Sequence, residues 1–158
     1  MPPAVVSNAS PLIAFEQIGH LELLERLFSF VLVPFAVAQE ITPTVSFRTW
    51  MEERALAQPI GPRILRASLG LGESEAISLA LEINAQFVIL DDRAARRLAA
   101  ALGLSVIGTL GVLLASKRRG FLPAIIPLLD ALMNLDFRIA PDLYTRVLAD
   151  AGEYEMRS

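Results

Sequence analysis

Two adjacent aspartates, Asp91 and Asp92, directly follow the apolar run Phe87 to Leu90, which predicts a buried strand. Two carboxylates about 4 Å apart repel each other by about 1 kcal/mol in water and by several times more near a protein surface. One aspartate is enough to cap the helix that we predict next, Arg93 to Leu102, so the second needs another explanation. The pair therefore favours a cation-binding role over capping alone.

Two glutamates stand at the start of the helix predicted from Glu73 to Asn84. Glu73 and Glu75 suit the positive end of a helix dipole, with Gly72 as the expected cap. Glu73 is also in register with three residues that we expect to face the sheet, Ala76, Ile77 and Ala80. A carboxylate on that face is costly to bury unless it binds something. Helix capping and ligand binding both remain open for this pair.

Polar residues also follow the first predicted strand, Ala4 to Ser7, where Asn8 and Ser10 begin the next segment. Ligands of open parallel sheets bind beyond the carboxyl ends of the strands, so these residues and the two aspartates are expected at one edge. Glu40 lies near the end of an apolar helical run, Phe35 to Ile41, and carries little information alone.

The elements that must position these residues alternate between short apolar runs and helical patterns. The predicted strands are Ala4 to Ser7, Phe30 to Val33, Phe87 to Leu90 and Ser105 to Ile107. The predicted helices are Leu12 to Ile18, His20 to Phe28, Phe35 to Ile41, Phe47 to Leu56, Glu73 to Asn84, Arg93 to Leu102, Thr109 to Arg119, Leu122 to Leu135 and Pro141 to Ala151. The alternation predicts an α/β fold of three layers, α/β/α, with a short and mostly parallel central sheet.

The chain of 158 residues suits a single domain. We assign residues 1–152 to it, with 121–152 as a C-terminal helical extension and 153–158 as a loose tail. The hydrophobic fraction of 54% is high, and the surplus fills either a large core or a surface covered by a partner. No membrane span or signal peptide is apparent, so a cytoplasmic location is expected.

Composition narrows the possible chemistry. The absence of cysteine excludes disulfides, thiol catalysis and cysteine-based zinc sites, and a single histidine disfavours histidine-rich metal sites and Ser-His-Asp triads. A metal here would have to be held by oxygen, as Mg²⁺ and Mn²⁺ are. The net charge of −3 does not indicate nucleic-acid binding, but a local basic patch could still provide phosphate contacts.

Four blocks of the chain, in order, resemble a PIN domain. They are Val5 to Ala14, Val33 to Ile41, Gly70 to Ile77 with Val88 to Arg96, and Ile107 to Leu114. Each block is weak alone, whereas the ordered set is fairly specific. The subgroup that the sequence resembles most is that of VapC-like toxins with extra C-terminal helices. The resemblance implies a metal-dependent ribonuclease, a Mg²⁺ or Mn²⁺ cofactor, an RNA substrate, a small antitoxin partner and a homodimer.

The resemblance also implies roles for individual residues. Asn8 stands where the family has its first aspartate, Glu40 matches the helix-borne glutamate, and the third and fourth acids are Glu73 or Glu75 and Asp91 or Asp92. The implied catalytic residues are Asn8, Glu40, Glu75 and Asp92. The implied metal ligands are Asn8, Glu40, Glu73, Glu75, Asp91 and Asp92. The implied substrate-binding residues are Ser10, Arg93, Arg96 and Thr109, and further candidates for phosphate contacts are Arg97, Lys117, Arg118 and Arg119.

The asparagine is the departure that matters, because Asn8 can offer a carbonyl oxygen but neither a charge nor a base. Metal affinity should fall, so a catalytically weak or silent PIN-fold module that binds RNA or a partner is the alternative function. A receiver-like phosphoacceptor domain fits less well, because it would place its acidic pair after the first strand, and the lone lysine is Lys117.

Overall fold

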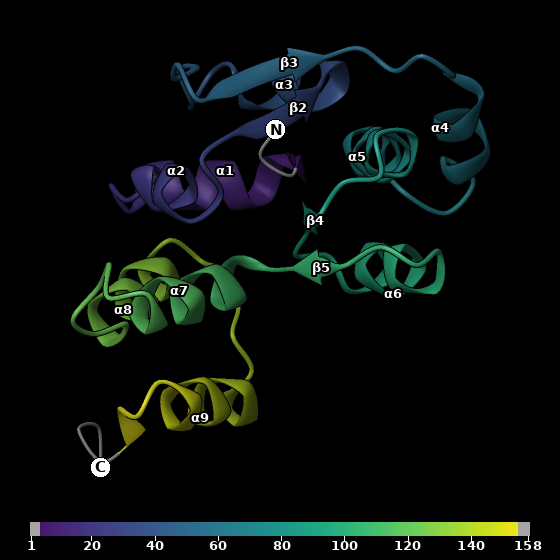
Figure 1. Ribbon diagram of the computed structural model, residues 1–158. Coiled ribbons are helices and arrows are strands. Elements are labelled where there is room, and N and C mark those ends of the chain that lie inside the picture. Colours follow the sequence, from purple (N-terminus) through teal and green to yellow (C-terminus); the bar gives the residue numbers. More distant parts are fainter. Residues whose placement is uncertain (1–3, 155–158) are drawn as a thin grey trace.

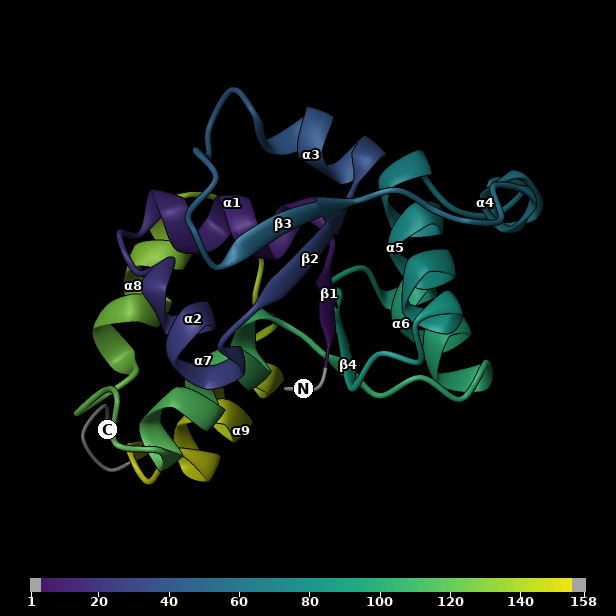
Figure 2. The same ribbon diagram turned by 45° about the horizontal axis from the view of Figure 1, so that its top comes forward.

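The computed structural model describes residues 4–154, and within them five strands form one parallel sheet in the order β3-β2-β1-β4-β5. Ala4 to Ser7 was predicted as the first strand, and the structure has Val5–Ser7. The strands are β1 (Val5–Ser7), β2 (Val31–Pro34), β3 (Met51–Arg54), β4 (Phe87–Ile89) and β5 (Val106–Ile107). Helices cover both faces of this sheet (Figure 2). The predicted three-layer α/β/α architecture is confirmed.

The helices follow the strands in the expected alternation (Figure 1). They are α1 (Ala9–Gln17), α2 (Glu22–Phe28), α3 (Phe35–Ile41), α4 (Ile60–Leu65), α5 (Leu71–Glu82), α6 (Arg93–Ala101), α7 (Thr109–Arg118), α8 (Ile126–Asn134) and α9 (Pro141–Asp150). Gly103 and Gly120, both at positive φ, follow the ends of α6 and α7, a conformation that glycine adopts without steric cost. Within residues 4–154 no helix is long and apolar enough to cross a membrane.

The two faces of the sheet bury separate apolar clusters because successive side chains of a strand point to opposite sides. Val5 and Ile89 face one cluster together with α1, α2, α7, α8 and α9, and Val6 and Val88 face the other together with α5 and α6. The register pairs Val6 with both Leu32 and Val88, so each cluster is continuous across strands. This double burial explains why the central strands read as unbroken apolar runs.

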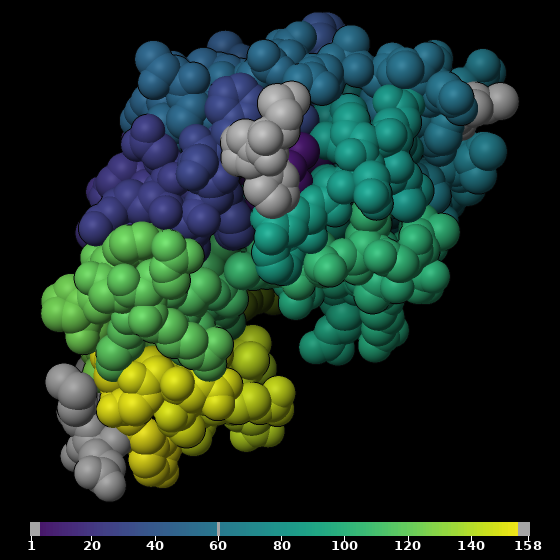
Figure 3. Space-filling model, viewed as in Figure 1, coloured from purple at the N-terminus to yellow at the C-terminus, as the bar shows by residue number. Residues whose placement is uncertain are grey.

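Much of the apolar surplus at the C-terminus fills the core. Leu129 and Leu132 of α8 and Val147 and Leu148 of α9 belong to the larger cluster, while Met133 is exposed. Helix α9 lies against α7, and its yellow atoms lie at the lower left of the molecule in Figure 3. Core packing therefore accounts for most of the apolar residues in the segment from Leu122 to Leu135, which was predicted as a helix.

Three expectations about single segments were wrong. The run from Phe47 to Leu56, predicted as helix, holds β3, which pairs in parallel with β2 at the sheet edge. Its exposed Glu52, Glu53 and Arg54 are typical of an edge strand and hid the strand pattern.

The second error concerns the start of α5, where Gly70 and not Gly72 occupies the N-cap position. The third concerns the tail predicted from residue 153. Glu153 is fully buried and accepts hydrogen bonds from the backbone N–H of Ile125 at 2.8 Å and of Ile126 at 3.2 Å. Residues 155–158 lie outside the described part of the chain.

Candidate active site

The carboxyl ends of β1 and β4 lie side by side, so the polar residues that follow β1 lie next to those that follow β4. Ser7 pairs with Ile89 in the sheet, and the backbone N–H of Asn8 donates to the Ile89 carbonyl at 3.0 Å. Asn8 occupies the N-cap position of α1, yet its side chain makes no capping hydrogen bond. Its Oδ1 atom is buried, and no donor from residues 4–154 reaches it. A buried amide oxygen without a partner is costly, so this atom is the first sign of a ligand site.

Gly72, in the first turn of α5, is where three elements meet. A methyl group at this position would collide with Glu40 Oε1 and would lie 3.3 Å from Asn8 Oδ1. Glu40 comes from α3 and is exposed, whereas Gly72 is buried. The glycine thus leaves room for an oxygen atom from each of two side chains that are far apart in sequence.

Glu73 lies next to this point and has an unusual environment. Its Oε2 atom is buried without a hydrogen-bond partner among the described residues, although its Oε1 approaches Gly70. Burial raises the pKa of Glu73 above 4.5, the neighbouring Asp92 carboxylate raises it further, and the charge of Glu40 adds to this rise. The Gly70 backbone opposes these effects but does not outweigh them. Glu73, Asp92 and Glu40 therefore repel one another across a common space.

In each acidic pair, one residue faces the space beside Gly72 and the other binds a neighbouring element. Asp92 caps α6, since its Oδ2 accepts the N–H of Ala95 at 3.0 Å. Asp91 is bound to Thr109 twice, by Oδ1 to the backbone N–H at 2.8 Å and by Oδ2 to the hydroxyl at 2.6 Å. Asp91 thereby attaches the N-terminus of α7 to the end of β4, and both of its oxygens are engaged.

Glu75, like Asp91, is engaged elsewhere. Its Oε1 accepts the backbone N–H of Ala36 at 2.9 Å, at the start of α3. The structure thus brings Asn8, Glu40, Glu73 and Asp92 toward one space and directs Glu75 and Asp91 to backbone donors at its border.

The donor set at this space fits a hard divalent cation. Within residues 4–154 no group of three histidine, cysteine, aspartate or glutamate side chains is arranged as a metal site. Such a group cannot include an asparagine, however, and Asn8 Oδ1 and Glu73 Oε2 are two of the four buried side-chain oxygens without a partner among residues 4–154. Amide and carboxylate oxygens are the ligands that Mg²⁺ and Mn²⁺ accept, and a cation would relieve the mutual repulsion at Glu73.

The comparison with known protein families agrees with this arrangement. A family model described as a PIN domain matches residues 4–153 of the chain. The chain belongs to the PIN-domain family. PIN domains are generally nucleases, and PIN nucleases typically use divalent metals. A search of curated proteins finds no match.

The residues predicted to bind substrate are spread over this PIN domain. Ser10 and Arg93 are exposed at the starts of α1 and α6, where a ligand could reach them. Arg96 donates to the Leu90 carbonyl at 2.8 Å, and Thr109 is fully buried against Asp91. These two side chains therefore already serve the local structure.

Two of the other candidate cations lie at the end of α7 that is remote from Asp91. Lys117 forms an ion pair of 2.8 Å with the buried Glu153, and Arg119 lies over the ring of Phe121 with its guanidinium 5.4 Å from the ring centre. Both stand at the C-terminal end of α7, opposite Thr109 at its start. Arg97 is exposed on α6, on the same helix as Arg93.

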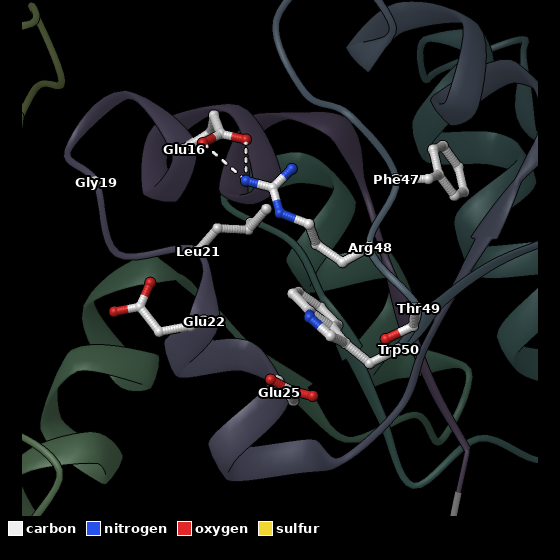
Figure 4. A pocket seen from close by; sticks show the side chains of 9 residues that line it. All are labelled: Glu16, Gly19, Leu21, Glu22, Glu25, Phe47, Arg48, Thr49 and Trp50. Carbon is white, nitrogen blue, oxygen red and sulfur yellow. Dashed lines mark hydrogen bonds and ion pairs between the residues drawn. The ribbon is translucent and has the colours of Figure 1, made fainter.

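A pocket of about 610 Å³ in the PIN domain lies elsewhere, between the end of α1, α2 and the segment that leads into β3 (Figure 4). Trp50 precedes β3, and its carbonyl accepts the N–H of Val31 at the start of β2, so the pocket is at the amino edge of the sheet. The pocket's Glu16 is neutralised by Arg48 at 2.9 Å. None of the predicted site residues lines this pocket, and we place the chemistry at the acidic edge instead.

Sequence reasoning missed two features of the acidic edge. Gly72 was read as a cap, although its role here is to leave room for side-chain oxygens. The contact between Glu75 and Ala36 joins residues 39 positions apart, and no sequence pattern marks it.

Proposed function

We propose that this PIN domain is a divalent-metal-dependent ribonuclease that hydrolyses RNA phosphodiesters, with Mg²⁺ or Mn²⁺ as its cofactor. The observation that carries the proposal is the pair of buried oxygens without donors, Asn8 Oδ1 and Glu73 Oε2, beside two further carboxylates at the carboxyl edge of the sheet. Of the alternatives left open by the sequence, we assign Glu73 and Asp92 to the site. The competing Asp91 accepts hydrogen bonds from Thr109 at both oxygens, and Glu75 accepts the Ala36 backbone N–H at Oε1.

The proposed chemistry follows from the charges. A bound Mg²⁺ or Mn²⁺ supplies stabilisation of the negative charge that builds up on phosphate and lowers the pKa of a nearby water. Glu73, Asp92 and the amide oxygen of Asn8 hold the cation. Glu40 is exposed, so it is the carboxylate that can accept a proton from the attacking water. Arg93, exposed one residue after Asp92, contacts a phosphate of the RNA.

The proposed biological context is that of a VapC-like toxin with a small antitoxin partner, and with a homodimer as the assembly. This part rests on the resemblance of the four sequence blocks to that subgroup. Co-expression of the chain with the product of its neighbouring gene, followed by measurement of complex mass, tests both partner and dimer.

The central experiment measures cleavage of labelled single-stranded and structured RNAs in Mn²⁺, Mg²⁺ and EDTA. The variant is Asp92→Asn, and the matched control is Asp142→Asn, an exposed aspartate in the first turn of α9. We expect metal-dependent cleavage that falls by roughly 100-fold or more in Asp92→Asn, since lost transition-state electrostatics cost about that much. Cleavage in EDTA, or equal cleavage by Asp92→Asn, would exclude this mechanism.

The second candidate is a PIN-fold module that binds RNA or a protein partner without turnover. Asn8 favours it, because the neutral amide removes one charge from the cation site and cannot serve as a base. Mn²⁺ binding and RNA binding without cleavage, by protein shown to be folded, would support this second candidate.

A further inference from the structure

Helix α3, which carries Glu40, has no cap of its own. Pro34 occupies its N-cap position and has no side-chain oxygen, and its first turn contains no acidic residue. The free backbone donors of a helix start need partners, and a side-chain oxygen can act as the acceptor. That acceptor comes from α5, since Glu75 Oε1 lies 2.9 Å from the N–H of Ala36.

The two helices are joined at a second point, next to the proposed cation site. Glu40, four residues after Ala36 on α3, has its Oε1 against Gly72, three residues before Glu75 on α5. The two contacts follow one another in opposite order on the two helices, about 6 Å apart on α3 and about 4.5 Å apart on α5 at 1.5 Å per residue. Figure 2 shows α3 and α5 side by side, and their residues are in contact. Movement of α3 at Ala36 would therefore shift Glu40 relative to Glu73.

We propose that Glu75 is a positioning residue, which fixes the distance between Glu40 and Glu73 by capping α3 from the neighbouring helix. The inference rests on the proposed function, because it concerns the same cation site. Glu75 is not a ligand itself in this scheme. Its hydrogen-bond acceptor at Oε1 matters, and its negative charge is secondary.

Two conservative variants separate positioning from direct binding. Glu75→Gln keeps a carbonyl oxygen at the same reach and loses the charge, whereas Glu75→Asp keeps the charge and is too short by one methylene to reach Ala36. Both changes are mild enough to preserve the fold. A positioning residue requires that Gln behaves like the wild type and Asp does not, and a metal ligand requires the reverse order.

The experiment titrates the full chain with Mn²⁺ by calorimetry and measures amide hydrogen exchange at Ala36 in EDTA. We expect Glu75→Gln to bind Mn²⁺ within about twofold of wild type, and Glu75→Asp to bind about tenfold more weakly, a loss typical of groups that orient metal ligands. Exchange at Ala36 should accelerate in Glu75→Asp alone. This readout requires neither metal nor RNA.

Each of the other outcomes contradicts either the positioning role of Glu75 or the cation site itself. Weaker binding by Glu75→Gln than by Glu75→Asp would make Glu75 a ligand and overturn the inference. Wild-type affinity in Glu75→Asp would overturn it as well, while the cation site itself would stand. A wild-type chain that binds no Mn²⁺ would overturn the proposed cation site and this inference together.

Discussion

Two glutamate carboxylates, the buried Glu153 and the partly buried Glu73, have pKa values displaced in opposite directions. Burial would raise the pKa of Glu153, but hydrogen bonds from Lys117, Ile125 and Ile126 and the charge of Lys117 lower it below 4.5. Glu73 is only partly buried, yet its pKa is raised by burial, by Asp92 and by Glu40. Side-chain identity is the same in both places, so the neighbours decide the outcome.

The difference separates a carboxylate that stabilises the fold from one that we propose to bind a cation. Both carboxylate oxygens of Glu153 accept hydrogen bonds within the chain, and these bonds link the segment after α9 to α7 and to the start of α8. Glu73 retains one oxygen without a donor and stands among like charges, an arrangement that destabilises the fold unless a cation arrives. We therefore interpret a carboxylate with all its hydrogen bonds made as one that stabilises the fold. A carboxylate with an oxygen that lacks a donor is interpreted as part of a binding site.

The largest expected effect comes from removing the carboxylate of Glu153 and with it the hydrogen bonds that it accepts. Glu153→Ala removes the ion-pair partner of Lys117, which keeps only the Ala151 carbonyl, and the acceptor of the backbone N–H groups of Ile125 and Ile126, so it should cost about 3 kcal/mol of unfolding free energy at pH 7. Because the folded-state pKa is lowered, this contribution is fully present above pH 4.5 and disappears as the pH falls through the folded-state value. Urea unfolding of wild type and variant across this range measures it.

Asp150→Ala is the matched control for this variant, since Asp150 is exposed at the end of α9, just before Glu153 in the chain. We expect it to change the unfolding free energy by less than about 0.5 kcal/mol. A similar loss in both variants would mean that the buried network does not distinguish Glu153.

A methyl group at Gly72 disturbs the region around Glu73 and leaves the region around Glu153 unchanged. Gly72→Ala should weaken Mn²⁺ binding by about 10- to 100-fold, because the new methyl displaces Glu40 and crowds Asn8. Stability without metal should hold or rise, since alanine is favoured over glycine in a helix by about 1 kcal/mol and the end of the Glu40 side chain can move. Calorimetric titration and urea unfolding test the two halves, and unchanged Mn²⁺ affinity would place the cation elsewhere.

Restoring a charge at position 8 should sharpen the contrast between the two regions. Asn8→Asp adds a carboxylate beside Glu40 and Glu73, so Mn²⁺ affinity should rise about tenfold while stability in EDTA falls. RNA cleavage, measured as in the central experiment, should increase in parallel if the site is catalytic. A variant with higher stability in EDTA would contradict the like-charge environment that we infer for this edge.

The parts of this picture that could be predicted from sequence are those set by local pattern. Apolar runs predicted β1 and β4, the period of Arg93 to Leu102 predicted α6, and polar residues after strand ends predicted the edge where acidic side chains gather. The choice within each acidic pair could not be predicted in this way. Glu73 and Glu75 share a helix turn, and their difference arises from Ala36 on another element.

Long-range pairing likewise decided the features that sequence reasoning got wrong. Strand β3 has charged residues at three of its four positions, and parallel pairing with β2 is what makes it a strand. Glu153 resembles a tail residue until Lys117, 36 positions earlier, and two N–H groups of the α8 start surround it. In both cases the deciding partner lies outside any local window.

The smallest expected effect isolates the raised pKa itself. Glu73→Gln removes the buried charge, so it should stabilise the metal-free protein by about 0.5–1 kcal/mol at pH 7.5. A raised folded-state pKa makes the ionised Glu73 destabilising above that pKa, and the penalty disappears as the pH falls toward 4.5, so the variant's advantage should vanish there. Urea unfolding in EDTA at pH 7.5 and pH 4.5 gives both values, and in excess Mn²⁺ at pH 7.5 the order should reverse, because only the wild type gains a bound cation. A destabilised Glu73→Gln in EDTA would mean that Glu73, like Glu153, is satisfied by the fold, and the contrast between the two glutamates would fail.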